Sequence, residues 1–319
     1  HFNTFTEKSM TRSLLLCLTF LFYTCQKEDT SYRQDNLLEN SLGIAATPSP
    51  FGENSLFFEN IAYGSGARNI LDVFLPKKVK PVGVVVFFHG GGFVSGDKSD
   101  AYADFLKNTM LQLLNEGVAI VSANYTLINS PNASGVISSL NDGEMVLNFI
   151  KNKLEVLNIP KNKILLAGVS AGAGIAQWNG YREASNDQVQ GIVALAAQST
   201  YNLYEWENVF LGFKLDELRN SNLDIENIFQ LFYNGTPTQT DLEAVDYRAF
   251  MDSDDPPVYI LNQAGDQVID AEGNLDFDVL YHSFLHGDYL RKKAIEVGLT
   301  YSGVFVESPE EFILRILRL

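Results

Sequence analysis

Short apolar runs alternate with amphipathic stretches along most of the chain. The apolar runs are rich in β-branched residues and mostly continuous, which is typical of strands covered on both faces in a parallel sheet. The stretches between them carry apolar residues at helical spacing and end at a glycine or a proline, as in 101–117 and 134–160. We therefore predict an α/β domain with a mostly parallel sheet flanked by helices. The predicted strands cover residues 55–63, 69–76, 82–89, 118–125, 163–169, 191–198, 257–263 and 301–307.

Residues 199–256 interrupt this alternation. The segment is rich in aromatic residues, irregularly patterned and too long for a simple connection in a compact domain. A cap or insertion over the carboxyl ends of the strands would account for it. The alternative is a peripheral helical excursion that covers nothing.

The N-terminal part of the chain follows a different pattern. A short basic start precedes the apolar run LLLCLTFLFY at 14–23, which is too short to span a bilayer as a mature helix. The run ends near Cys25, and this arrangement resembles a bacterial lipoprotein signal in which Cys25 is lipidated. We expect 1–25 to be a signal segment and 26–50 a flexible tether, with the protein exported to the cell envelope and anchored there by lipid. An ordinary export signal or a membrane anchor is the alternative.

The amino-acid composition limits the partners and the kinds of site that we expect. With 46% hydrophobic residues among 319, the chain has enough apolar surface to bury a large core in one domain, which we place at 51–319. Its 39 acidic residues against 23 basic ones give a formal charge of −16, which argues against a nucleic-acid partner. Cys17 and Cys25 both precede the domain, so we expect neither a disulfide nor a thiolate metal site in it. No HExxH pair is present among the four histidines, and we expect neither a metal nor a cofactor.

A serine boxed by small residues follows the predicted strand at 163–169. The sequence GVSAG at 168–172 matches the GxSxG pattern of a nucleophile elbow, in which the serine lies on a sharp turn between a strand and a helix. Such a turn leaves no room for side chains two positions before and two after the serine, and glycine occupies both. The helix that follows would place its N-terminus beneath Ser170 and favour negative charge there. Ser170 is therefore the predicted nucleophile.

Residues 89–92 read His-Gly-Gly-Gly directly after the third predicted strand. An HGGG loop at this place supplies backbone N–H groups to an oxyanion, and glycine lets the chain turn these amides toward a substrate. We predict an oxyanion hole formed by the amides of Gly91, Gly92 and Ala171, with His89 supporting the loop. For HGGG taken alone, a phosphate-binding or merely tight loop is the alternative.

These motifs together carry a family resemblance. Over about residues 55–315 the chain resembles α/β-hydrolases of the esterase/lipase type, close to hormone-sensitive-lipase-like and carboxylesterase-like bacterial enzymes. The resemblance rests on HGGGF, GVSAG and the stretches VSANYTL and SSLNDGEMVLNFI. It implies the chain order serine, acid, histidine. The acid expected on that order is Asp266, after the strand at 257–263, and Asp270 is the second candidate.

The histidine departs from the family pattern. Members usually carry it after the last strand, but no histidine follows His286 in this chain. His282 and His286 are the remaining candidates for the base. The stretch YHSFLHGDYLRKKA resembles a motif of esterase-like hydrolases that lack the late histidine, and His282 takes the matching place in it. Two alternatives stay open: a relative that has lost catalysis, and a C-terminus altered by truncation or a reading-frame change.

The sequence thus predicts a serine hydrolase that cleaves carboxylic esters by acyl transfer. Its expected substrates are small-molecule or polysaccharide-linked esters, and its expected contact with a membrane is through the lipid anchor alone. The rival is a catalytically weak or inactive binding or scaffold lipoprotein built on a hydrolase fold.

Overall fold

The computed structural model describes residues 37–319 except 271 and 273. The chain divides into two compact units, 1–45 and 46–319, and the second carries the fold and the site. The predicted signal segment and Cys25 lie outside the described residues, so lipidation stays a prediction. No helix of the described residues is long and apolar enough to cross a membrane.

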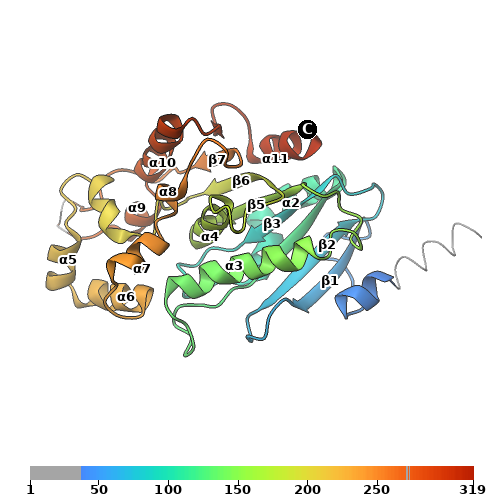
Figure 1. Cartoon of the computed structure of the whole chain (residues 1–319), viewed down its shortest axis with the longest axis horizontal. Coiled ribbons are helices and arrows are strands. Elements are labelled where there is room, and N and C mark those ends of the chain that lie inside the picture. The colour runs from blue at the N-terminus through green and yellow to red at the C-terminus, as the bar shows by residue number, and fades with distance from the viewer. Residues whose placement is uncertain (1–36, 271, 273) are drawn as a thin grey trace, which may run out of the picture. The chain divides into compact units, whose positions relative to one another are not determined.

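Among the described residues, eight strands form one sheet at the centre of 46–319 (Figure 1). Their order across the sheet is β1-β2-β4-β3-β5-β6-β7-β8. The pairs β1/β2 and β2/β4 are antiparallel and every other neighbouring pair is parallel, so the prediction of a mostly parallel α/β sheet is confirmed. The strands are β1 (Ser55–Ala62), β2 (Ile70–Pro76), β3 (Gly83–Phe88), β4 (Val118–Ala123), β5 (Ile164–Val169), β6 (Val189–Leu195), β7 (Val258–Leu261) and β8 (Tyr301–Ser302).

The last strand is shorter than predicted. β8 pairs with β7 only through Tyr301 and Ser302, and the chain then turns at Gly303, whose carbonyl accepts hydrogen bonds from the amides of Val306 and Glu307. The apolar residues 304–306 are exposed. The predicted strand at 301–307 is therefore wrong beyond Ser302, because an apolar run forms a strand only where a neighbouring strand satisfies its backbone groups.

Helices cover both faces of the sheet. α2 (Asp104–Asn115) and α11 (Pro309–Arg318) pack on one face, where they share a buried core with alternate residues of β3 and β5. α4 (Ala171–Gly180) packs on the opposite face, with α3 (Val136–Lys151) against it. The central strands are thus buried on both sides, which explains their continuous apolar sequences.

The segment 199–256, called the cap here, connects β6 to β7 and is largely helical. It contains a short 3₁₀ helix and four α-helices, which are η2 (Leu203–Asn208), α5 (Leu215–Ser221), α6 (Leu223–Tyr233), α7 (Gln239–Ala244) and α8 (Tyr247–Phe250). The remaining helices described within 46–319 are η1 (Lys98–Tyr102), α9 (Phe277–His282) and α10 (Phe284–Val297).

The aromatic residues of the cap form a second apolar core together with α9. Trp206, Phe213 and Phe229 are buried in it beside Leu280 of α9. Arg219 of α5 also lies 3.6 Å above the Phe229 ring of α6 and pairs with Glu226 on α6. The aromatic residues of the cap therefore stabilise a separate layer of helices. This layer packs onto α9, the helix that carries His282.

Candidate active site

Ser170 lies at the junction of β5 and α4, as the GVSAG pattern predicts. Its backbone has φ 54° and ψ −119°, a conformation that residues with a side chain seldom adopt. A Cβ atom on Gly168 would lie 2.1 Å from the carbonyl oxygen of Gly172, and one on Gly172 would lie 2.1 Å from that of Phe88. Glycine is therefore required at both flanking positions, and the tight turn presents the Ser170 hydroxyl at the carboxyl edge of the sheet.

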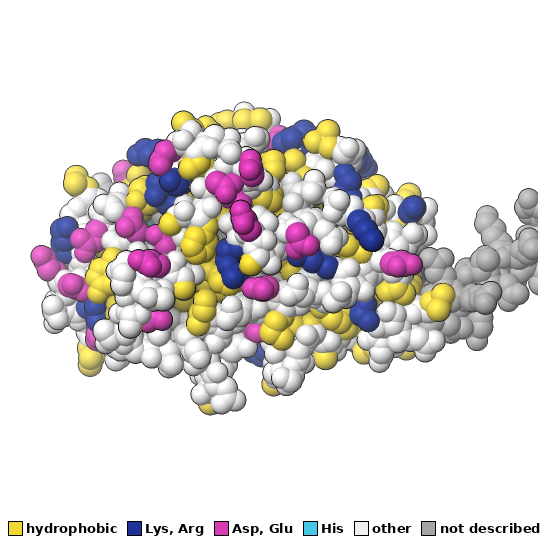
Figure 2. Space-filling model, in the orientation of Figure 1, with side chains coloured by type: hydrophobic (Ala, Val, Ile, Leu, Met, Phe, Trp, Pro, Cys, Tyr) yellow, Lys and Arg dark blue, Asp and Glu magenta, His cyan; other side chains and the backbone are white. Residues whose placement is uncertain are grey.

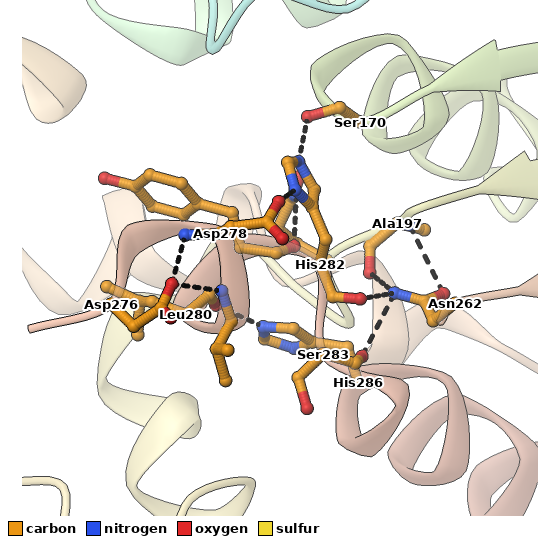
Figure 3. A network of polar contacts seen from close by, with 12 residues as sticks. Ser170, Ala197, Asn262, Asp276, Asp278, Leu280, His282, Ser283 and His286 are labelled. Carbon is orange, nitrogen blue, oxygen red and sulfur yellow. Dashed lines mark hydrogen bonds and ion pairs between the residues drawn. The ribbon is translucent and has the colours of Figure 1, made fainter. Parts of the chain in front are cut away.

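His282, the last residue of α9, contacts this serine (Figure 3). Its Nε2 lies 2.9 Å from Ser170 Oγ, and its Nδ1 lies 2.7 Å from Oδ1 of Asp278. Because a carboxylate only accepts, Nδ1 carries the proton and Nε2 accepts a hydrogen bond from the serine hydroxyl. Asp278 and His282 are four residues apart on one helix, which places them on the same face. The three side chains form a continuous chain of hydrogen bonds.

Two side chains hold α9 in this position. The Asp276 carboxylate caps the helix by accepting hydrogen bonds from the amides of Asp278 and Val279. At the other end, Nδ2 of Asn262, the residue after β7, lies within hydrogen-bond distance of the carbonyl oxygens of His282 (3.2 Å) and Ser283 (3.1 Å). The imidazole is therefore fixed at a helix end that is tied to the central sheet.

The carboxylate that contacts His282 differs from the one that the family resemblance implies. Asp266 is exposed and lines a separate hollow beside Lys214 and Glu217, and Asp270 bonds locally to Asn274. The carboxylate at His282 is thus Asp278 and not Asp266. The prediction of Asp266 is wrong because the family order places the acid directly after β7, whereas the four-residue spacing of Asp278 and His282 in FDVLYH is the sequence signal that indicates the pair.

His286, the second candidate base, has a different environment. It is fully buried on α10, where its Nε2 donates to the carbonyl of Leu280 (2.9 Å) and its Nδ1 accepts from the Ser199 amide and faces the Ser199 hydroxyl. Its ring packs against Trp206 and Phe210. The structure therefore brings His282 to Ser170 and uses His286 to join the cap to α10.

We expect protonation of His286 to destabilise the fold in mild acid. Burial lowers the pKa of His286 to about 4, whereas an unfolded histidine has a pKa near 6.5. The unfolded chain binds the proton first, so this stabilisation is complete above about pH 6.5 and is lost as the pH falls toward 4. Urea unfolding should show a loss of about 2 kcal/mol from this group between pH 7.5 and pH 5. His286→Gln should reduce this pH dependence and His282→Gln should keep it; an unchanged slope in His286→Gln would refute the assignment.

The HGGG loop lies next to the elbow. Gly91 and Gly92 have φ values of 103° and 60°, and a Cβ atom on Gly91 would lie 2.3 Å from the carbonyl oxygen of Ser95. Within the described part of the chain, the amides of Gly91, Gly92 and Ala171 donate no hydrogen bond to another protein group. All three residues line the hollow that Ser170 and His282 also line.

His89 holds the HGGG loop in place through several contacts. Its Nδ1 donates to the Gly90 carbonyl (2.7 Å), its Nε2 accepts from Arg68 (3.2 Å), and its ring stacks on Tyr125 at 4.3 Å. The Tyr125 hydroxyl in turn donates to the carbonyl of His89. Burial lowers the pKa of His89, so the ring stays neutral and keeps both of these contacts.

The hollow beside Ser170 has a volume of about 650 Å³ and is open to solvent. The elbow and the HGGG loop form one end of it. The cap and α9 supply most of the remaining lining, including Phe213, Leu218, Ile225 and Phe229. The cap residues therefore determine which groups fit beside the serine.

Comparisons with known proteins agree with this architecture. A sequence model of the BD-FAE family matches residues 71–278, about two thirds of the chain. An isoprenylcysteine alpha-carbonyl methylesterase of Arabidopsis thaliana is 35% identical over 121 residues, which are 37% of this chain and 26% of that protein. The Crystal protein of Dictyostelium discoideum is 36% identical over 110 residues, 32% of this chain and 19% of that protein. The chain thus matches about a quarter or less of the length of these relatives.

Solved structures share the fold at low sequence identity. A truncated form of a carbohydrate esterase from gut microbiota superposes with a TM-score of 0.61 at 14% identity, covering 85% of this chain and 97% of that one. Esterase B from Lactobacillus rhamnosis superposes with a TM-score of 0.57 at 15% identity, covering 89% and 84%. Taken with the elbow, the HGGG loop and the family match, these findings show that the chain belongs to the BD-FAE family and is an α/β-hydrolase of the esterase type.

Proposed function

We propose that this protein hydrolyses carboxylic esters by acyl transfer, with Ser170 as nucleophile, His282 as general base and Asp278 as the carboxylate that orients the imidazole. The observation that carries the proposal is the hydrogen-bond chain from Ser170 Oγ to His282 Nε2 (2.9 Å) and from His282 Nδ1 to Asp278 (2.7 Å). A hydroxyl is a weak nucleophile without an adjacent base, and this geometry supplies one.

The reaction has two halves. Ser170 Oγ attacks the ester carbonyl while its proton passes to His282 Nε2, and Asp278 stabilises the resulting imidazolium. The tetrahedral anion collapses, the alcohol leaves with the proton from His282, and an acyl-serine remains. Water then attacks the acyl-serine, giving its proton to His282, and the second tetrahedral intermediate releases the acid as Ser170 regains its proton.

The amides of Gly91, Gly92 and Ala171 are the proposed oxyanion donors. They line the same hollow as Ser170 and donate to no acceptor among the described residues. Preorganised donors of this kind each contribute roughly 2.7 to 4 kcal/mol to transition-state stabilisation. The position of Ala171 at the N-terminus of α4 adds to this, because that end of the helix favours negative charge.

The proposed substrates are small-molecule or polysaccharide-linked esters encountered at the cell envelope, where the signal-like N-terminus and a lipid anchor at Cys25 would place the protein. The formal charge of −16 and the acidic side chains spread over the face in Figure 2 argue against a polyanionic partner. The names of the relatives, a methylesterase and a carbohydrate esterase, support an ester bond as the target.

Labelling with an alkyl fluorophosphonate tests the proposal. Such a probe forms a covalent bond with an activated serine, so peptide mass spectrometry should locate one label per chain on Ser170. Ser170→Ala should take no label and should not hydrolyse p-nitrophenyl butyrate. Ser221→Ala, an exposed serine of α5, serves as the matched control and should keep both properties. Unlabelled native protein without turnover would instead support a binding or scaffold role.

A further inference from the structure

We infer that the hollow beside Ser170 binds the acyl group of the substrate and selects an unsubstituted hydrocarbon chain longer than butyryl. The inference rests on the proposed function and names the substrate class for that same site. Three properties of the hollow carry it: the chemistry of its lining, the engagement of its polar side chains, and its size.

The lining contributed by the cap and α9 is almost entirely hydrocarbon. Leu218, Ile225, Ile228 and Phe229 of α5 and α6 line the hollow together with Leu280 of α9. None of these side chains offers a hydrogen bond, so a polar substituent on the acyl group would lose its water without gaining a partner. An apolar chain gains free energy in the same place.

The polar side chains of the lining are mostly occupied by other protein groups. Gln198 donates to the carbonyl of Tyr281 (2.7 Å), and the Tyr201 hydroxyl lies 3.1 Å from the carbonyl oxygen of Ala171. The indole N–H of Trp206 donates to the carbonyl of Thr200 (3.0 Å). The Tyr281 hydroxyl has no such partner within the described residues. If the hollow preferred a hydroxylated aryl acyl group, this hydroxyl would be the partner for its polar substituent.

The volume of about 650 Å³ exceeds what a short acyl group fills. Each buried methylene contributes about 0.8 kcal/mol, equivalent to roughly a fourfold gain in kcat/KM. Ile228 and Leu231 lie at the open side of the hollow with exposures of 42% and 38%. A longer chain would therefore extend toward these residues and cover apolar surface that water contacts in the free protein.

The test is a series of p-nitrophenyl esters from acetate to octanoate, each kept below its micelle concentration, together with the methyl ester of a hydroxylated cinnamic acid. We expect kcat/KM to rise at least tenfold from butyrate to octanoate. The cinnamate is compared with methyl octanoate, which has the same leaving group, and methyl octanoate should exceed it. A flat or falling series, or a preference for the cinnamate over methyl octanoate, would overturn the inference while leaving Ser170-dependent hydrolysis intact. Absence of both hydrolysis and phosphonate labelling would instead reject the proposed function and the inference with it.

Variants on α6 test whether the lining of the hollow causes the preference for longer acyl chains. Ile225→Asn introduces a polar group into the lining and should remove the gain for octanoate while acetate hydrolysis is kept. Leu223→Asn makes the same kind of change two residues away on the same helix, at a side chain that is 73% exposed and outside the lining, and should leave the whole series unchanged. Ile228→Asn, at a partly exposed position that tolerates a polar group, should reduce the gain even if Ile225→Asn disturbs the cap. If native protein, Ile225→Asn and Ile228→Asn all show the same gain in kcat/KM for octanoate, the assignment of the hollow as the acyl-binding site is contradicted.

Discussion

His282→Ala is expected to lower kcat for a short ester by 10³-fold or more. In the proposed mechanism the imidazole accepts the Ser170 proton across the 2.9 Å contact and gives it to the leaving alcohol. Removing one member of a serine triad typically leaves only the catalysis due to binding and the oxyanion donors. Steady-state kinetics with p-nitrophenyl butyrate measure the loss.

His286→Ala is the matched comparison, because both histidines lie within five residues of each other and only one contacts Ser170. It should lower the midpoint of thermal unfolding, since it leaves Ser199 and Leu280 with unpaired polar groups. Assayed well below that midpoint, its kcat should stay within a few fold of the native value. Equal losses of kcat in the two variants would refute the placement of the base.

Asp278→Asn should have the second-largest effect, a loss of about 10²- to 10³-fold in kcat. The amide no longer stabilises the imidazolium and permits the wrong tautomer of His282. The expected loss is smaller than for a buried triad acid, because the Asp278 side chain is 75% exposed and solvent screens its charge. Its exposure also means that folding should be unaffected, which circular dichroism would verify.

Asp266→Asn is the control for this prediction. Both aspartates are exposed and both substitutions remove one negative charge, but Asp266 lines a different hollow. We expect its kcat to match that of the native protein. A loss in Asp266→Asn as large as in Asp278→Asn would restore the acid that the family order implies.

The esterase-type α/β-hydrolase fold could be predicted because its signals are local. Gly168 and Gly172 are required by backbone contacts within the turn itself, and the apolar runs follow from burial on both faces of the sheet. The elbow serine and the HGGG loop follow strands in the sequence, so parallel pairing of β3 with β5 places them at one edge.

The acid could not be predicted in the same way. Asp266 and Asp278 both follow β7, and the family order favours the aspartate nearer to the strand over the one spaced four residues before His282. What decides is the placement of α9, which brings His282 to Ser170 and Asp278 to His282. That placement depends on Asn262 binding the end of α9 and on the cap core packing against Leu280.

The sequence by itself determined the alternation of buried strands with helices, the serine turn and the glycine loop, because each depends on residues that are close together in the chain. Only the tertiary structure decided that His282 rather than His286 reaches Ser170, that Asp278 rather than Asp266 supports it, and that the cap encloses an apolar hollow. These outcomes depend on how the elbow, the cap and α9 pack together, and Ser170 and His282 are 112 residues apart in the chain. Burial and hydrogen bonding between these elements select one partner among several of the same chemical type.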